Sequence, residues 1–361
     1  MQPTVTVPRP ARNLSVLFIS LYGLSALYIF HKMLINYSNS SYIERLTTPE
    51  AIGLFYAVGS AGAIAMLMFS PRFFQFLDQR WLILIITVAQ VISLLLVGLD
   101  INPLLTLTAF VVSLILMPSV GLVIDLLAEA AMGDNESATG TRWALMLSAM
   151  SIVSIAATLT LAGVVGDNPN RLSLTYFISA VALVILLVLV QFLLRKNALP
   201  KPASINIRQS LTKLWNDRNL KYAYFARLTL SIFFGTVAIY LPLYLVQEIG
   251  FSWTVIGLLL SVEMSAYLLS EYPIGKLADT RWGEVEMLVG GFFLSASVML
   301  IISVVTTPMI LVWITLFFAM GLGGSLIETT LVSYYYKHTT ARDIDLISFF
   351  RTTTPFAAGI G

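Results

Sequence analysis

The sequence repeats itself at long range, and this repetition limits the folds that the chain can adopt. Four short segments of the first half recur, in the same order, in the second half: residues 23–28 (GLSALY) as 235–240 (GTVAIY), 52–54 (IGL) as 256–258 (IGL), 78–81 (DQRW) as 279–282 (DTRW) and 124–125 (ID) as 327–328 (IE). The last three pairs lie 201 to 204 residues apart and the first pair 212, so the first loop is 8 residues longer in the first half. The pattern predicts two similar halves, as in many transporters.

The composition indicates that these halves lie in a membrane. Hydrophobic residues make up 58% of the chain, charged residues 11%, and the mean hydropathy is +0.86. A soluble domain carries about 25% charged residues. The chain has no cysteine and two histidines, His31 and His338, so we expect no disulfide, no metal site and no cofactor.

Apolar segments long enough to span a membrane recur along the chain, since a spanning helix needs about 20 residues. They lie at residues 14–35, 51–70, 81–99, 103–127, 141–165, 172–194, 220–246, 253–272, 285–305 and 308–334, and another begins near residue 344. We therefore predict an all-α polytopic membrane protein. It would have an N-terminal six-helix bundle (1–194), a cytoplasmic linker (195–219) and a C-terminal bundle of four helices and part of a fifth (220–361). Two sets of six would make twelve helices, so we expect the chain to be cut short at its C-terminus.

The basic residues fix the expected orientation, because Lys and Arg accumulate in cytoplasmic loops. With the N-terminus inside, the inner segments hold 16 of the 21 Lys and Arg residues: Arg9, Arg12, Arg72, Arg80, Arg142, Arg195, Lys196, Lys201, Arg208, Lys213, Arg218, Lys221, Lys276, Arg281, Lys337 and Arg342. The opposite side holds Lys32, Arg45 and Arg171. Lys32 falls near the outer end of the first helix, where we expect its long side chain to extend to the membrane interface. The sequence thus predicts a multi-pass protein of the cell (inner) membrane with a cytoplasmic N-terminus.

The linker between the halves allows two interpretations. Ile207, Leu211, Leu214 and Trp215 recur at the spacing of one helical face, which suits a short amphipathic helix on the inner membrane surface. An ordinary basic linker would carry the same charges.

The loop at residues 275–283 (GKLADTRWG) resembles the signature loop of the major facilitator superfamily, which lies between the second and third helices of a half. The copy at residues 71–81 (PRFFQFLDQRW) keeps the acid and the arginine but lacks the leading glycine. The resemblance implies a bacterial-type transporter with two bundles around a cavity that opens alternately to either side. It also implies that the first and seventh helices line the cavity, where Tyr22, Tyr28 and Tyr240 could contact a substrate. The alternative is that these tyrosines belong to the aromatic belt at the membrane interface.

The loop motif has a physical rationale of its own. Gly275 and Gly283 permit a tight turn, Asp279 can accept hydrogen bonds at a helix start, and Arg281 can pair with an acid on another helix. A cytoplasmic gate would combine this motif with charged groups at the same depth: Asp78, Arg80, Asp125, Arg142, Arg227, Glu271, Glu328 and Arg351. The alternatives are a simple basic turn and, for the charged groups, a substrate pocket.

Glu263 is the ionisable residue expected deepest in the membrane. It lies 11 positions after Ser252, or roughly 16 Å along a helix at about 1.5 Å per residue. Ionisable groups at this depth are costly and mark functional sites. No basic residue neighbours it in sequence, so burial favours the neutral carboxyl, as proton coupling or a cationic substrate would require. The alternative is a hydrogen-bonded structural glutamate.

The leading hypothesis is a secondary active transporter that moves a small solute by alternating access and is coupled to protons. It would act as a monomer in the lipid bilayer, without nucleic acid and without enzymatic activity. The alternatives are a transporter-like sensor or partner protein and a lipid-handling protein, which the degenerate first loop keeps open.

Overall fold

The computed structural model describes the backbone of residues 14–76, 79–132, 136–196, 207–280, 283–337, 346, 349–350 and 352–360. Side chains are described over residues 22–48, 51–69, 81–124, 147–192, 212–278 and 283–335, and at 346, 349–350 and 352–359. The statements below concern these residues.

The described chain is built from long helices: α1 (Leu14–Asn36), α3 (Pro49–Phe76), α4 (Gln79–Leu99), α5 (Pro103–Met132), α6 (Glu136–Val165), α7 (Leu172–Lys196), α9 (Arg218–Gln247), α10 (Trp253–Thr280), α11 (Glu284–Ile302) and α12 (Ile310–Lys337). Shorter elements are α2 (Asn39–Ile43), α8 (Ile207–Asn216), α14 (Thr353–Ile360) and a 3-10 turn (Pro169–Arg171). Nine of the long helices are long and apolar enough to cross a membrane over their described residues. The prediction of an all-α polytopic membrane protein is confirmed.

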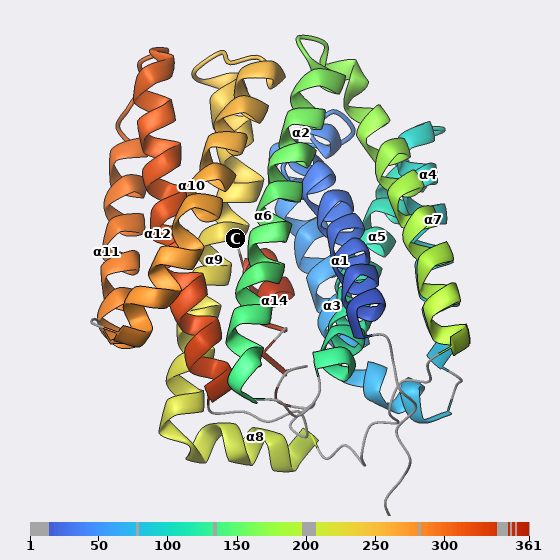
Figure 1. The fold of residues 1–361 in the computed structure, drawn as a ribbon. Helices are drawn as coiled ribbons and strands as arrows, with labels where there is room; N and C mark the ends of the chain where they lie inside the picture. Colours follow the sequence, from blue (N-terminus) through green and yellow to red (C-terminus); the bar gives the residue numbers. More distant parts are fainter. Residues whose placement is uncertain are drawn as a thin grey trace, which may run out of the picture.

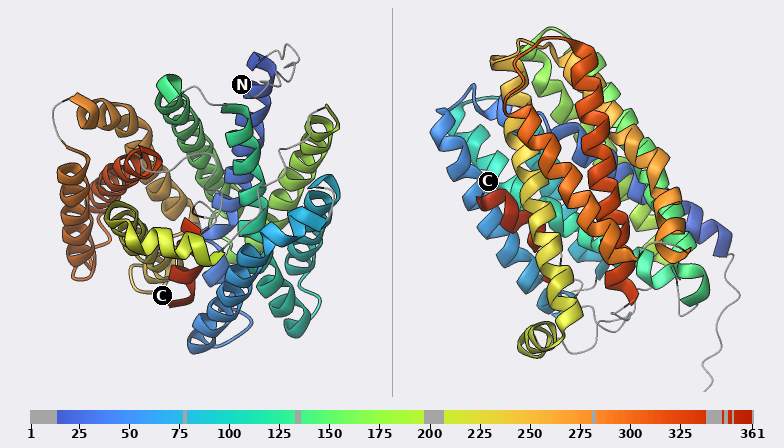
Figure 2. Two further views of the ribbon diagram at one scale, coloured as in Figure 1. Left: turned by 90° about the horizontal axis from the view of Figure 1, so that it is seen from below. Right: turned by 90° about the vertical axis from the view of Figure 1, so that its left-hand side faces the viewer.

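The helices gather on two sides of the molecule (Figure 1). Helices α9 to α12 lie on one side and α1, α3, α4, α5 and α7 on the other, while α6 packs lengthwise against α10 between them. The last element, α14, packs between α3 and α9. The views from below and from the side show α8 lying crosswise at one end of the bundle (Figure 2).

Helix α6 meets α10 through small and hydroxyl-bearing residues. A methyl group on Gly257 would collide with the Thr158 carbonyl and with Ala162. One turn further on, the hydroxyl groups of Thr158 and Ser261 lie 2.8 Å apart. Close backbone approach through small residues is how helices associate in membranes, where apolar surface alone gives little preference. This line of contact, the α6–α10 seam, joins the first half of the chain to the second.

The outer surface of the bundle is apolar. Phe293 and Leu300 on α11 and Leu104 on α5 are each more than two-thirds exposed. Such side chains are unfavourable in water but suit the lipid hydrocarbon. The structure therefore places apolar side chains both in its core and on its periphery.

Candidate functional site

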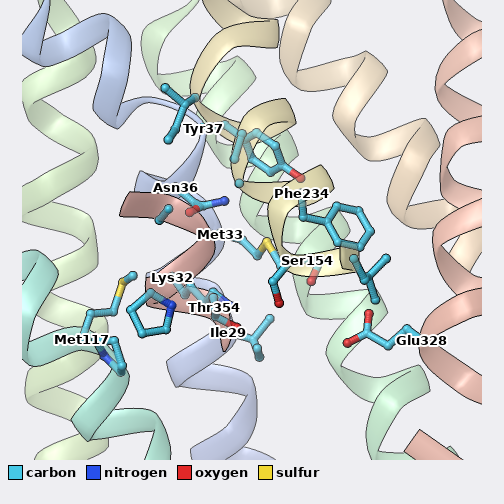
Figure 3. Close-up of a pocket in the computed structure, with 18 of the residues that line it drawn as sticks. Ile29, Lys32, Met33, Asn36, Tyr37, Met117, Ser154, Phe234, Glu328 and Thr354 are labelled. Atoms are coloured by element: carbon cyan, nitrogen blue, oxygen red, sulfur yellow. The ribbon is translucent and has the colours of Figure 1, made fainter. Parts of the chain in front are cut away.

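A cavity of about 280 Å³ lies between the two sides of the molecule. One face of α1 lines it at helical spacing, with Ile29, Lys32, Met33 and Asn36. One face of α9 lines it opposite, and includes Phe234. Figure 3 shows these side chains directed toward a common space. The first and seventh long helices thus line the cavity, as the resemblance implied.

The cavity wall combines soft apolar groups with hydrogen-bonding groups. Methionines come from four different helices, and polar side chains gather near α2: Met33, Met117, Met150 and Met264, with Asn36, Tyr37, Asn39 and Tyr56. Methionine is flexible and polarisable, so it adapts to ligands of irregular shape. The amide and phenol groups supply directional contacts.

Charged groups of the cavity wall come mainly from the second half. Arg227 on α9 forms a salt bridge with Glu328 on α12, with 3.1 Å between the Nη1 and Oε1 atoms. The guanidinium carbon of Arg227 also lies 5.7 Å from the centre of the Phe350 ring. Ser151 on α6 donates a hydrogen bond of 3.1 Å to Glu271 on α10, so a polar contact crosses the α6–α10 seam beside the cavity.

Glu263 lies on α10 directly behind the cavity wall. Its side chain is 0% exposed, and neither carboxyl oxygen has a hydrogen-bond partner among the described residues. It is not part of the wall, but Met264 and Tyr267 beside it are. Tyr37 and Tyr267, two buried tyrosines of the wall, lie in the surroundings of this carboxyl group. An ionised carboxylate without a partner would be costly at such a position, so the site favours the protonated group.

Helix α2 contributes to the cavity wall through Asn39 and bridges the two halves by its contact with α9. The Ser40 hydroxyl donates a buried hydrogen bond of 2.7 Å to the backbone carbonyl of Ile239 on α9. The Gln247 amide donates to the Glu44 carboxylate nearby. Helix α2 lies in the loop that is 8 residues longer in the first half, so an insertion relative to the repeat makes this contact.

The tyrosines predicted to contact substrate lie elsewhere. Tyr28 donates a hydrogen bond to the backbone carbonyl of Met117, and its hydroxyl fills the space beside Gly121. Tyr240 is 45% exposed, and Tyr22 is half-buried. None of the three is among the described residues that line the cavity. Their contribution to a substrate site stays a prediction without support from this geometry.

The predicted gate residues are only partly described. Arg227 and Glu328 are paired, and Glu271 lies beside them in the cavity wall. Gly275 is a half-buried residue of α10 close to Thr329, and Gly283 precedes α11 as its N-cap. The other gate residues lie outside the described side chains: Asp78, Arg80, Asp125, Arg142, Asp279, Arg281 and Arg351. The gate therefore stays a prediction.

Sequence reasoning missed two contributors to the cavity. Lys32 was expected to extend to the membrane interface, yet it lines the cavity. The spacing of Ile29, Lys32, Met33 and Asn36 marks one helical face and could have placed it there. The second contributor, the turn at Tyr37 and the start of α2, carried no periodic signal.

Two helical groups enclose a cavity and carry apolar side chains on their outer surface, an architecture found among membrane transporters. The family model described as Major Facilitator Superfamily matches residues 14–361, so the chain belongs to this superfamily.

Relatives differ in how much of the chain they match. The multidrug resistance protein MdtG of Salmonella typhi is 31% identical over 174 residues, which cover 46% of this chain and 42% of that protein. The matched stretch therefore spans less than half of the relative. Among solved structures, FucP in its outward conformation gives a TM-score of 0.69 at 17% identity, covering 97% of this chain and 91% of that one. The nucleoside transporter NupG gives 0.66 at 13% identity, covering 96% and 89%. These two likenesses show the fold alone.

Proposed function

We propose that the protein is a secondary active transporter that carries a small organic solute through the central cavity and couples its movement to protons. The observation that carries this proposal is the position of Glu263. A fully buried carboxyl group that has no hydrogen-bond partner among the described residues is costly to keep in a fold, and Glu263 lies next to the wall of a cavity that both halves line.

Alternating access needs a cavity whose two ends are closed by different contacts. At one end, Ser40 and Glu44 hold α2 against α9. At the level of Glu271, the seam is held by the hydrogen bond from Ser151. Breaking one set while keeping the other would expose the cavity to one side at a time. The basic residues of the sequence support a cytoplasmic position for the end that carries α8, so α2 would close the outer end.

Proton coupling would follow from the link between Glu263 and the wall. Tyr37 belongs to the turn before α2, which contacts α9, and Tyr267 belongs to α10, which packs against α6. Both tyrosines therefore lie on elements that contact the opposite half. Binding or release of a proton at Glu263 would change the interaction with both tyrosines. A ligand shifts a conformational equilibrium only when it binds the two conformations with different affinity. A proton on Glu263 would do so if the surroundings of the two tyrosines differ between the conformations.

The cavity wall supports an organic solute with an apolar body and hydrogen-bonding groups. Four methionines and Phe234 would contact the body, whereas Asn36, Asn39 and the ion pair of Arg227 and Glu328 would contact polar groups. Similar proteins are named for multidrug resistance, a fucose:proton symporter and a nucleoside transporter. These names set the range of solutes to be screened.

The test is solute flux in vesicles of purified protein with an imposed pH gradient. A panel of sugars, nucleosides and amphipathic drugs is screened with and without a protonophore. We expect at least one solute to accumulate against its gradient and the protonophore to abolish this accumulation. Binding of a solute without any flux would contradict transport and support a sensor. Flux that the protonophore leaves unchanged would contradict proton coupling.

A further inference from the structure

The junction between α8 and α9 carries exposed aromatic rings beside basic side chains. Trp215, Tyr222 and Phe225 are 64%, 53% and 46% exposed. The rings of Trp215 and Phe225 lie edge to face, 6.4 Å apart. Aromatic residues of this kind are enriched at the level of lipid headgroups, where one part of the ring system is wet and the other apolar. Helix α8 lies crosswise at this end of the bundle, with α9 rising from it (Figures 1 and 2).

The basic side chains lie against these rings. The Arg218 guanidinium is 5.4 Å from the centre of the Tyr222 ring and donates a hydrogen bond of 3.1 Å from Nε to the Tyr222 hydroxyl. The Lys221 ammonium is 6.0 Å from the centre of the Trp215 ring. The rings therefore hold two positive charges over one surface, which we call the elbow surface (Trp215, Arg218, Lys221, Tyr222 and Phe225).

The elbow surface is fixed by packing on its inner side. Leu214 points inward and is buried with Leu220, Ala223, Leu331 and Tyr335 from α9 and α12. Because Leu214 is held, its neighbour Trp215 is presented outward. The arrangement is thus preformed, and binding a ligand there would cost little ordering entropy.

The charge of the surrounding sequence is one-sided. Residues 195–221 contain seven basic residues, Arg195, Lys196, Lys201, Arg208, Lys213, Arg218 and Lys221, and one acidic residue, Asp217. Asp217 caps α9 by accepting hydrogen bonds from the backbone N–H groups of Asn219 and Leu220. Arg218 and Lys221 lie in the first turn of α9, where the helix dipole disfavours positive charge. An anion on the elbow surface would offset this cost.

We propose that the elbow surface binds the anionic headgroups of phospholipids in the membrane leaflet that adjoins α8. Arg218 and Lys221 would contact the phosphate, and Trp215, Tyr222 and Phe225 would lie at the boundary between headgroups and acyl chains. Clusters of basic residues beside a spanning helix are attracted to anionic lipid in this way. The proposal does not depend on proton coupling or on the transported solute.

Native mass spectrometry of the detergent-purified protein, titrated with phosphatidylglycerol or phosphatidylcholine, tests the proposal. The variant Arg218→Gln/Lys221→Gln removes two charges from the elbow surface. The control Arg45→Gln/Arg171→Gln removes two exposed charges at the opposite end of the molecule. We expect the wild type and the control to retain phosphatidylglycerol in preference to phosphatidylcholine. In the elbow variant the affinity for phosphatidylglycerol should fall on the order of tenfold, whereas Arg218→Lys/Lys221→Arg should keep it.

Three results would overturn the proposal. One is equal retention of the two lipids by the wild type, and another is an equal loss in the control variant. The third is binding of soluble glycerol phosphate as tight as that of phosphatidylglycerol, because the site would then recognise a free phosphate and not a lipid surface. The midpoint of thermal unfolding without added lipid verifies that the elbow variant is folded.

Discussion

The two halves of the chain bury polar side chains in different ways. In the described part of the first half, several buried polar groups pair with neutral side chains: Gln90 donates to Ser113 at 3.0 Å, and Tyr176 donates to Asn39 at 2.8 Å. The second half places the carboxyl groups of Glu263, Glu271 and Glu328 in or beside the cavity wall. Neutral pairs hold a fixed geometry, whereas carboxyl groups can change charge. The carboxyl groups of the described cavity wall thus come from the second half, and we propose that these groups respond to protons.

The repeat makes this difference visible at one pair of positions. An offset of 204 residues places Gly59 opposite Glu263. A methyl group on Gly59 would collide with Leu114, so α3 and α5 are in close contact there. On α10 the same position carries a buried carboxyl group. If Glu263 couples protons as we propose, the coupling group lies in the second half alone.

The largest effect is expected where the two halves meet. In Gly257→Leu the new side chain would collide with the backbone of α6 at Thr158 and Ala162. Overpacking typically costs about 1–3 kcal/mol, and we expect the upper end because backbone atoms cannot move aside easily. Gly163→Leu is the matched control, since this exposed glycine of α6 has open space beside it. The midpoint of thermal unfolding of each variant, compared with that of the wild type, measures the loss of stability. Equal midpoints for the two variants would show that the seam is not tightly packed.

A smaller effect is expected from the polar contact across the seam. Ser151→Ala leaves the buried Glu271 carboxylate without its hydrogen-bond donor. An unsatisfied buried group costs about 1–3 kcal/mol. Glu271→Gln should cost less, because the amide oxygen can still accept from Ser151 and no charge remains buried. Unfolding of the purified protein in detergent would give the loss of stability of Ser151→Ala and of Glu271→Gln. If Glu271→Gln is the more destabilising of the two, the charge of Glu271 stabilises the fold, and the contrast between the halves weakens.

The smallest effect is expected at α2. Ser40→Ala removes one hydrogen bond to Ile239, worth about 1 kcal/mol, which corresponds to roughly a fivefold shift in the closing equilibrium. The reporter is Ala238→Cys in the cavity wall, placed in a chain without native cysteines. An impermeant thiol reagent added from outside should label it several times faster in the Ser40→Ala background. Ser41→Ala is the control, because the Ser41 hydroxyl has no hydrogen-bond partner in the described structure. Equal labelling rates of Ala238→Cys in the Ser40→Ala and Ser41→Ala backgrounds would argue that α2 does not close the outer end.

Local sequence signals predicted the helices well because a spanning helix is set by a local property, its run of apolar residues. The expected segment at residues 253–272 and the observed α10 (Trp253–Thr280) begin at the same residue. The helix continues through Pro273 and Gly275 into the motif that we expected to form a tight turn.

The site was predicted less well because its parts are brought together by packing between helices. The position of Glu263 along its helix predicted a site deep in the membrane, and the structure shows that the side chain is buried. This prediction was possible because depth follows from position along a single helix. Depth alone could not show which side of a helix faces the cavity. Tyr28 therefore proved to pack beside Gly121, while Lys32, four residues further along α1, lines the cavity.

Solute accumulation by Glu263→Gln under an imposed pH gradient tests directly whether this carboxyl group couples protons to transport. Glutamine keeps the size and shape of the protonated carboxyl group but cannot release a proton. Glu248→Gln, which changes an exposed carboxylate after the end of α9, is the matched control. We predict that the wild type and the control accumulate solute, while Glu263→Gln exchanges solute across the membrane without accumulating it. Accumulation by Glu263→Gln at the wild-type level would contradict the claim that this carboxyl group couples protons to transport.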